Sequence, residues 1–297
     1  MPRIALVTAD AARQLDDDLP PLQAALEALG AEVATPAWDD AAFDWRAVDL
    51  ALLRSTWDYS QRLGEFLAWI DRAAAQTRLL NPPAMLRWNT DKHYLGELAH
   101  AGVATVPGSY VEPGDDAESA LGNFLARHGD SADFVVKPCV GAGSRDAQRY
   151  GRSETAAADA HLRRLLAAGR SALLQPYLDR VDSLGETALV FIDGGYSHAI
   201  RKGPLLRRGE GPTRALFAAE HITPREPDAA ERELAERTLA AVPFAAPLLY
   251  ARVDLLRTTD GAPCLLELEL AEPSLFFAHA AGSAARFAAA VLARAAA

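Results

Sequence analysis

Cysteine is scarce in this sequence, and long apolar runs are absent. The two cysteines, Cys139 and Cys264, lie far apart, so they form neither a disulfide framework nor the close ligand spacing of a zinc site, and a reducing cytoplasm is expected. The start of the chain, MPRIALVTAD, lacks the pattern of a signal peptide, and the longest uncharged run, 238–251, is too short to span a bilayer. We therefore expect a cytoplasmic protein without a membrane-spanning segment.

Positive charge is also in short supply. Lysine and arginine number 30 against 40 aspartates and glutamates, which gives a net charge of −10. Such a balance disfavours nucleic acids and anionic membranes as partners, and a small anionic ligand would need a local basic pocket. Assembly into a homo-oligomer stays open.

The 297 residues exceed the usual limit of one compact core. The first eighty residues alternate strand-like and helix-like segments in the βαβ manner, which predicts an open α/β sheet with strands at 3–7, 31–35, 48–53 and 78–81 and helices at 20–30 and 64–76. A helix over 89–102, opened by Asn89 or Thr90, should follow. We expect three domains, 1–105, 106–178 and 179–297.

The second and third domains are expected to be of the α+β class. In the second domain we expect a helix at 116–129, a strand at 133–140, a loop at 141–151, a helix at 154–169 and a strand at 171–178. The third should contain hairpins at 186–202 and 248–270, with a helix at 228–242 between them and an alanine-rich helix at the end.

The hairpin at 248–270 concentrates charged residues. If Asp260-Gly261 forms a two-residue turn, Asp254 faces Glu267 and Arg252 faces Glu269, and all four side chains lie on one side of the sheet. Three carboxylates there would repel one another without a multivalent cation, and their hard oxygen atoms suit Mg²⁺. The alternative is a solvent-exposed polar face balanced by Arg252.

Fixed cations for phosphate groups occur earlier in the chain. Lys137 follows an apolar strand, and the loop VGAGSR begins three residues later, with backbone N–H groups able to close over an anion. Lys92 is expected early in its helix, where a cation is unfavourable unless an anion lies near. Alternatively, these are an ordinary surface loop and lysines whose ammonium groups reach solvent.

Taken in chain order, these segments resemble the ATP-grasp family. The resemblance rests on the Lys92 helix, the Lys137 strand with its glycine loop, the QPYL strand, the IRK strand and the acidic hairpin. The motifs are most similar to a glutathione-synthetase-like branch that includes cyclo-ligases closing O-ureido-D-serine to D-cycloserine. The resemblance implies an N-terminal α/β sheet, two subdomains that clamp the nucleotide, and an ADP-forming carbon–nitrogen ligase that uses ATP and Mg²⁺.

The same resemblance implies roles for individual residues. Lys92 and Lys137 would hold the ATP phosphates. A lid loop and a strand facing adenine would complete the nucleotide site with Gly141, Gly143, Ser144, Gln175, Pro176, Tyr177 and Leu178.

Two parts of this assignment are less direct. An acid after the QPYL strand would hold the ribose, and Asp179, Asp182 and Glu186 all compete for that role. The metal ligands would be Asp254, Glu267 and Glu269. Many relatives have asparagine where this chain has Glu269, so the placement of metals is a point of departure from the family.

Catalysis of acyl transfer through a phosphorylated carboxylate needs cations near the transferring group. Arg252, Arg201 and Lys202 are the candidates. If Asp193-Gly194 forms the turn of its hairpin, Glu186 faces Arg201, and the pair could equally be a simple cross-strand ion pair.

The segment RSTWDY follows the predicted strand at 48–53, at the edge of the sheet where ligands collect in open α/β folds. Arg54 could pair with a substrate carboxylate, Ser55 and Thr56 could hydrogen-bond it, and Asp58 could take an α-ammonium group. The alternative is a polar loop whose two aromatic side chains pack into a domain interface.

We therefore predict a ligase acting on a small amino-acid-like carboxylate, with a nitrogen of the same molecule as the attacking group. An intermolecular ligase, an enzyme that modifies a peptide terminus and a non-catalytic ATP-binding regulator are the alternatives. The chirality of the substrate is left open.

Overall fold

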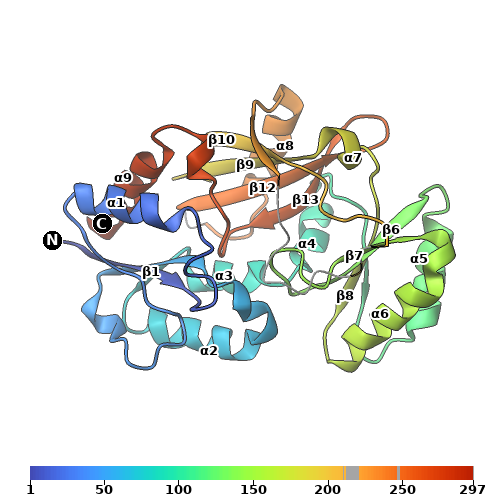
Figure 1. Cartoon of the computed structure of the whole chain (residues 1–297), viewed down its shortest axis with the longest axis horizontal. Helices are drawn as coiled ribbons and strands as arrows, with labels where there is room; N and C mark the ends of the chain where they lie inside the picture. The colour runs from blue at the N-terminus through green and yellow to red at the C-terminus, as the bar shows by residue number, and fades with distance from the viewer. Residues whose placement is uncertain (210, 212–220, 246–247, 297) are drawn as a thin grey trace.

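The computed structural model of the protein describes residues 1–209, 211, 221–245 and 248–296. The described residues form three β-sheets covered by helices (Figure 1). In that view the first sheet is blue, the middle sheet is green at the right, and the third sheet runs from yellow to red above them. This mixed α/β architecture agrees with the prediction. No described helix is long and apolar enough to cross a membrane.

The first sheet has four parallel strands in the order β2-β1-β3-β4. They are β1 (Arg3–Thr8), β2 (Glu32–Ala34), β3 (Leu50–Ser55) and β4 (Arg78–Leu80). One face packs on α1 (Leu19–Ala28) and α9 (Ser283–Ala296), and the other packs on α2 (Leu63–Ala74). The interiors of β1 and β3 are apolar because helices bury both faces of the sheet. The strands and helices predicted for this region are confirmed.

The middle sheet is antiparallel, in the order β5-β8-β6-β7. Its elements are β5 (Ser109–Val111), α5 (Ala117–Arg127), β6 (Asp133–Pro138), β7 (Gln148–Gly151), α6 (Thr155–Ala167) and β8 (Ala172–Pro176). Both helices pack on one face, as Figure 1 shows at the right. β7 lies in a segment that was predicted to be a loop. It is only four residues long, and it pairs with β6 while Tyr150 packs against Phe134.

The third sheet has the order β11-β10-β9-β12-β13. Its strands are β9 (Glu186–Ile192), β10 (Gly195–Lys202), β11 (Ile222–Arg225), β12 (Tyr250–Arg257) and β13 (Pro263–Glu269). The remaining helices are α3 (Pro83–Asn89), α4 (Tyr94–His100), α7 (Val181–Leu184), α8 (Ala229–Ala240) and the 3₁₀ turns Trp45–Ala47, Trp57–Gln61, Arg152–Glu154 and Phe277–His279. The two predicted hairpins and the helix between them are confirmed, whereas β11 was not predicted.

The predicted helix over 89–102 is confirmed in its second half, as α4, but its predicted start is wrong. α3 ends at Asn89 and α4 begins only at Tyr94, so Lys92 lies in the turn between two helices. The Asn89 side chain donates to the Leu268 carbonyl at 2.7 Å, and Asp91 accepts a hydrogen bond from the His93 backbone N–H at 3.1 Å. These bonds replace helix hydrogen bonds and fix the turn that carries Lys92.

The register of the β12–β13 hairpin matches the prediction where the charged residues lie. Arg252 pairs with Glu269, and Asp254 pairs with Glu267. Nearer the turn the pairing shifts by one residue, because Leu266 is an extra residue in β13. The strands are therefore joined by a longer loop over 258–262 rather than by the two-residue turn on which the prediction was based.

A second bulge changes the β9–β10 hairpin. The pairing shifts between Tyr196 and His198, so Glu186 faces Lys202 and Thr187 faces Arg201. The prediction that Glu186 faces Arg201 is wrong for this reason. Because side chains alternate along a strand, Arg201 lies on the opposite face from Lys202.

Asn81 joins the first sheet to the third. Its buried side chain donates to the carbonyls of Tyr250 and Leu270 at 2.9 and 2.8 Å and accepts from the Leu249 N–H at 3.0 Å. One amide side chain thus satisfies three backbone groups that are shielded from water. The three sheets lie within the predicted ranges 1–105, 106–178 and 179–297, whose independence as domains stays a prediction.

We expect Asn81→Ala to lower the free energy of unfolding by about 3 to 5 kcal/mol, because it leaves these backbone groups without partners. Urea unfolding followed by circular dichroism measures this. Asn123→Ala, in an exposed position of α5, is the matched control and should change the free energy by less than about 0.5 kcal/mol. A loss below about 1 kcal/mol for Asn81→Ala would contradict this role.

Candidate active site

A cavity of about 400 Å³ opens between the three sheets. Its walls come from β6 and β8 of the middle sheet, from β9, β10, β12 and β13 of the third, and from segments that follow β1 and β3 of the first. The chain contains three lysines, Lys92, Lys137 and Lys202, and all three line this cavity. All three side chains are largely buried. All lysines of the chain therefore line this one cavity.

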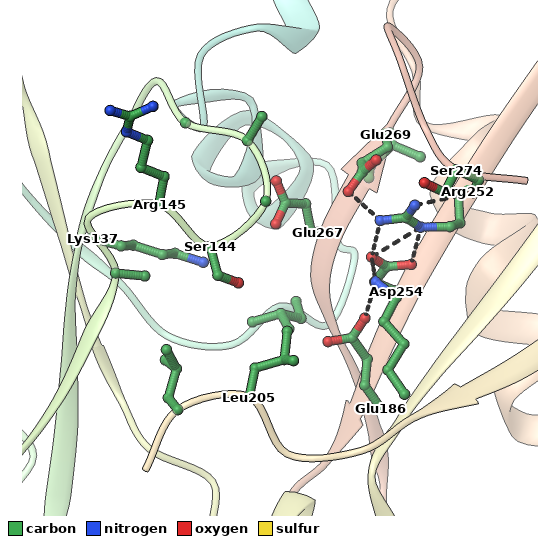
Figure 2. Close-up of a pocket in the computed structure, with 18 of the residues that line it drawn as sticks. Lys137, Ser144, Arg145, Glu186, Leu205, Arg252, Asp254, Glu267, Glu269 and Ser274 are labelled. Carbon is green, nitrogen blue, oxygen red and sulfur yellow. Dashed lines mark hydrogen bonds and ion pairs between the residues drawn. The ribbon is translucent and has the colours of Figure 1, made fainter. Parts of the chain in front are cut away.

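The acidic hairpin forms one wall of the cavity (Figure 2). Arg252 extends along Asp254, with its Nε at 2.9 Å from Asp254 Oδ1, and it also bonds the Glu269 carboxylate. Its Nη1 donates to the Ser274 carbonyl at 3.1 Å. Since all of these groups are substantially buried, the acids are held close together by the cation that lies between them.

Lys202 continues this network to the next strand pair. Its ammonium lies 2.8 Å from Asp254 Oδ2 and 2.6 Å from Glu186 Oε1. Arg201, the other predicted cation, does not line the cavity as far as the chain is described; its guanidinium donates to the carbonyls of Leu184 and Ser183. The bulge in β10 explains why Lys202, and not Arg201, faces Glu186.

The pKa values of the acids show how far the cations compensate for burial. Burial alone would raise the pKa of Asp254, but Arg252 and Lys202 outweigh it and hold that pKa below its ordinary value. Burial raises the pKa of Glu269 to about 7 and that of Glu186 to about 8, despite their cationic neighbours. The neighbouring cations are therefore too few to keep all the carboxylates of the site ionised.

Lys92 and Lys137 approach the same acids from the opposite side. The Lys92 ammonium lies 2.8 Å from Glu267 Oε1 and donates to the Gly141 carbonyl at 3.1 Å. Burial of Glu267 would raise its pKa, but Lys92 and Lys137 outweigh this and lower it. Among the described residues, Lys137 makes no hydrogen bond or ion pair of its own, and burial lowers its pKa to about 8.

The glycine loop after β6 lies beside these lysines, and Figure 2 shows Lys137 and Ser144 across the cavity from the Arg252–Asp254 pair. The predicted Gly141, Gly143 and Ser144 all line the cavity. Gly143 has φ of 60°, a conformation that glycine adopts at little cost. Asp146 anchors the loop by accepting hydrogen bonds from Arg164 and Arg170 at 2.9 and 2.8 Å.

The end of β8 borders an apolar part of the cavity. Gln175 and Pro176 at the end of β8 and the next two residues, Tyr177 and Leu178, line the cavity, as predicted for the adenine site. The apolar side chains beside them are Val106, Val135, Val181, Leu256 and Leu266. Aliphatic walls of this kind suit a flat heteroaromatic ring.

Of the three acids that competed for the ribose position, the structure brings only Glu186 to the cavity among the described residues. Asp182 is exposed and pairs with Arg149 at 3.2 Å, while the Tyr177 hydroxyl donates to it at 2.5 Å. Asp179 is also exposed. The short helix α7 turns both of these aspartates outward.

The polar residues of RSTWDY do not reach the cavity in the described structure, which corrects the prediction for Arg54, Ser55, Thr56 and Asp58. Arg54 is fully buried and lies 3.5 Å from Asp18 and 3.9 Å from Asp16. The remaining polar side chains face inward: Ser55 bonds Thr8, Thr56 is buried, and Asp58 accepts from the Trp38 indole. The position of the segment after β3 is as predicted, but contacts with residues distant in sequence turn these polar side chains away from the cavity.

The aromatic residues of that segment line the cavity instead. Trp57 and Tyr59 are joined there by Glu272 and Ser274, which follow β13 directly. Sequence reasoning did not select these four residues as site residues. The motif LELELAEPSLFF held the signal for the last two, because Glu272 and Ser274 follow the metal-type acids within a few residues.

A family model described as the N-terminal domain of the D-cycloserine synthetase DcsG matches residues 4–81. The cycloserine biosynthesis protein DcsG of Streptomyces lavendulae is 41% identical over 295 residues, which cover 98% of this chain and 98% of that protein. The crystal structure of D-cycloserine synthetase DcsG superposes with a TM-score of 0.92 at 41% identity and covers 99% of each chain.

More distant structures share the fold. The D-alanine–D-alanine ligase of Bacillus anthracis complexed with ATP has a TM-score of 0.68 at 16% identity, covering 99% of this chain and 97% of its own. The ATP-grasp ligase PsnB complexed with minimal precursor, Mg and ADP has a TM-score of 0.64 at 18% identity, covering 99% of this chain and 98% of its own. The predicted ATP-grasp fold is confirmed.

The depressed pKa of Lys137 can be measured directly, because the protein has only three lysines. In protein labelled with ¹³C at lysine Cε, we expect one resonance to titrate with a midpoint of about 8, charged below and neutral above. Lys137→Arg should remove that resonance. Glu267→Gln should lower the midpoint further, since the Glu267 charge opposes the effect of burial. A midpoint at the ordinary value of 10.5 would contradict the structure.

Proposed function

This chain belongs to the D-cycloserine synthetase (DcsG) family of ATP-grasp ligases, and from this premise we propose that it closes O-ureido-D-serine to D-cycloserine. It is an ATP-dependent carbon–nitrogen ligase acting on a small molecule. The substrate carboxylate takes the γ-phosphoryl group of ATP, and the ureido nitrogen that is bonded to oxygen displaces phosphate and closes the ring. Hydrolysis of the carbamoyl group on that nitrogen then releases CO₂ and ammonia and leaves D-cycloserine. The observation that carries the proposal is identity of 41% along the whole chain, and a cavity built from cations and carboxylates supports it.

We assign the nucleotide to the side of the cavity formed by the middle sheet. The adenine ring fits between the aliphatic side chains beside β8, and backbone groups of Gln175–Leu178 lie at its edge. Glu186 is the acid available to the ribose hydroxyl groups. Lys92, Lys137 and the N–H groups of the glycine loop then meet the phosphates, whose negative charge would stabilise the buried Lys137 ammonium.

Asp254, Glu267 and Glu269 fit magnesium. They supply oxygen donors only, lie on paired positions of one hairpin, and include a carboxyl whose raised pKa indicates a deficit of positive charge. Magnesium, when bound, neutralises charge on the phosphate oxygens. Glu269, where many relatives have asparagine, adds one negative charge to this donor set.

Arg252 and Lys202 hold these carboxylates in place and bring fixed positive charge to the position of the transferring phosphoryl group. Preorganised cations of this kind stabilise charge that develops in the transition state without reorganisation. Arg201 has no part in this, because it lies on the opposite face of β10. Both cysteines are free and buried, which supports a reducing cytoplasm as the place of action.

The proposed function is tested directly by asking whether the protein closes the ring of its substrate. Incubation with O-ureido-D-serine, ATP and Mg²⁺ should yield ADP, phosphate and a cyclic product without any second amino acid, as measured by mass spectrometry. Excess D-alanine at millimolar concentration should barely compete, because intramolecular attack has an effective molarity that can reach about 10⁵ M.

Reactions without ATP and with the L-enantiomer serve as controls. A dipeptide that forms only when a second amino acid is present would reject ring closure in favour of an intermolecular ligase. Formation of AMP and pyrophosphate would reject phosphorylation of the carboxylate.

Glu267→Gln should reduce turnover about a hundredfold or more while the protein stays folded, because one charge is lost without creating a cavity. Rates at increasing Mg²⁺ concentration measure this effect, and thermal unfolding checks the fold. Glu236→Gln, in an exposed position of α8, is the matched control and should keep full turnover. Normal turnover of Glu267→Gln at saturating Mg²⁺ would show that the hairpin is not the metal site.

A further inference from the structure

Glu272 is a buried acid of the cavity to which the reaction described above assigns no role. It follows β13 by three residues, lines the cavity and is 8% exposed. Two aromatic residues that follow β3 of the first sheet contact Glu272. The Trp57 indole donates to the Glu272 backbone carbonyl at 3.1 Å, and the Tyr59 side chain lies near its carboxyl group. The backbone at Glu272 is thus anchored beside these two aromatic residues.

Glu272 differs from the other buried acids of the cavity in its charge balance. Glu186 and Asp254 pair with Lys202, Glu267 pairs with Lys92, and Glu269 pairs with Arg252. In the segment that follows β1, Asp16 and Asp18 lie within 3.9 Å of Arg54. Among the residues that the structure describes, Glu272 has no ion pair.

A buried carboxylate is costly unless a cation accompanies it. The nearest lysine cannot serve, because the Lys92 ammonium is already bound to Glu267 and to the Gly141 carbonyl. Burial raises the pKa of Glu272 to about 8, and a cation that arrives with a ligand small enough to enter beside Trp57 and Tyr59 would stabilise its charged form. Aromatic rings next to an acid suit a primary ammonium group, which they contact through their faces.

The position of Glu272 also fits the geometry of an α-amino acid. Glu272 follows β13 by three residues and lines the cavity together with Glu267 and Glu269, so it adjoins the hairpin where the substrate carboxylate would be phosphorylated. In an α-amino acid the ammonium and carboxylate groups are attached to the same carbon atom. A residue that binds the ammonium group must therefore lie directly beside the phosphorylation site.

We propose that Glu272, anchored beside Trp57 and Tyr59, binds the α-ammonium group of the amino-acid substrate and selects for substrates that carry it. This assignment rests on the proposed function. It gives Glu272 the role that sequence reasoning gave to Asp58, which is bonded to Trp38 outside the cavity.

The test compares O-ureido-D-serine with its deamino analogue, 3-(ureidooxy)propanoate, in wild-type protein and in Glu272→Gln. Wild-type protein should prefer the amino compound by about a hundredfold in kcat/KM, and Glu272→Gln should lose this preference, because truncating one partner of a buried charge pair has an effect of this order. The variant's kcat/KM for the deamino compound should stay unchanged. Glu272→Asp, which keeps the charge, should restore part of the preference.

Glu65→Gln removes an exposed carboxylate in α2 and is the control that should leave the preference intact. An equal loss for both compounds in Glu272→Gln would indicate a structural role and overturn the proposal, as would an unchanged preference.

Calorimetric binding of the two compounds in the presence of ADP and Mg²⁺ separates this proposal from the proposed function. If neither compound is turned over, a preference of wild-type protein for the amino compound that Glu272→Gln abolishes still supports ammonium recognition. Equal binding of both compounds by wild-type protein overturns it.

Discussion

The contact between Arg252, Asp254 and Lys202 is the constraint on which the rest of the site depends. A carboxylate that is buried this deeply stays charged only because two cations flank it, and each cation in turn reaches a further acid, Glu269 or Glu186. The chain of alternating charges runs across β13, β12, β9 and β10. Loss of Asp254 would leave Arg252 paired only with Glu269 and Lys202 paired only with Glu186, and this loss of a shared buried partner costs more than any single surface ion pair contributes. The outer acids keep pKa values near neutrality, so the network has room for the charge of a metal ion and its nucleotide.

The first sheet contributes to this site indirectly. Asp18 accepts backbone hydrogen bonds from Leu275, Phe276 and Phe277, and the buried Arg54 lies beside its carboxylate. Phe276 has a positive φ of 52°, a conformation that these bonds hold in place. Arg54 therefore supports the segment that begins just after Glu272 and Ser274, rather than the substrate itself. Within the segment RSTWDY, Arg54 stabilises the loop over 275–277 through Asp18, while Trp57 and Tyr59 line the cavity.

The sequence predicted those strands and charged pairs that depend on residues close together in the chain. Asp254 pairs with Glu267 as predicted, although the two-residue turn on which that prediction was based is absent. Lys92 and Lys137 both line the cavity, Lys92 from a turn rather than from the predicted helix. The failures share one cause. The bulges at Ser197 and Leu266 depend on packing against neighbouring strands, so neither the partner of Glu186 nor the length of the β12–β13 loop could be derived from turn residues. Arg54 likewise meets aspartates 36 and 38 residues away, a contact that only the folded chain creates.

The confinement of lysine to the cavity has a practical consequence. Arginine supplies all other basic side chains, and its guanidinium does not react with ordinary acylating reagents for amines. Of the amino groups in this protein, the N-terminus lies on an exposed residue, while the three lysines are largely buried. Amine-directed reagents that are too large to enter the cavity should therefore leave the lysines unmodified, and a bound nucleotide should shield the lysines from smaller reagents.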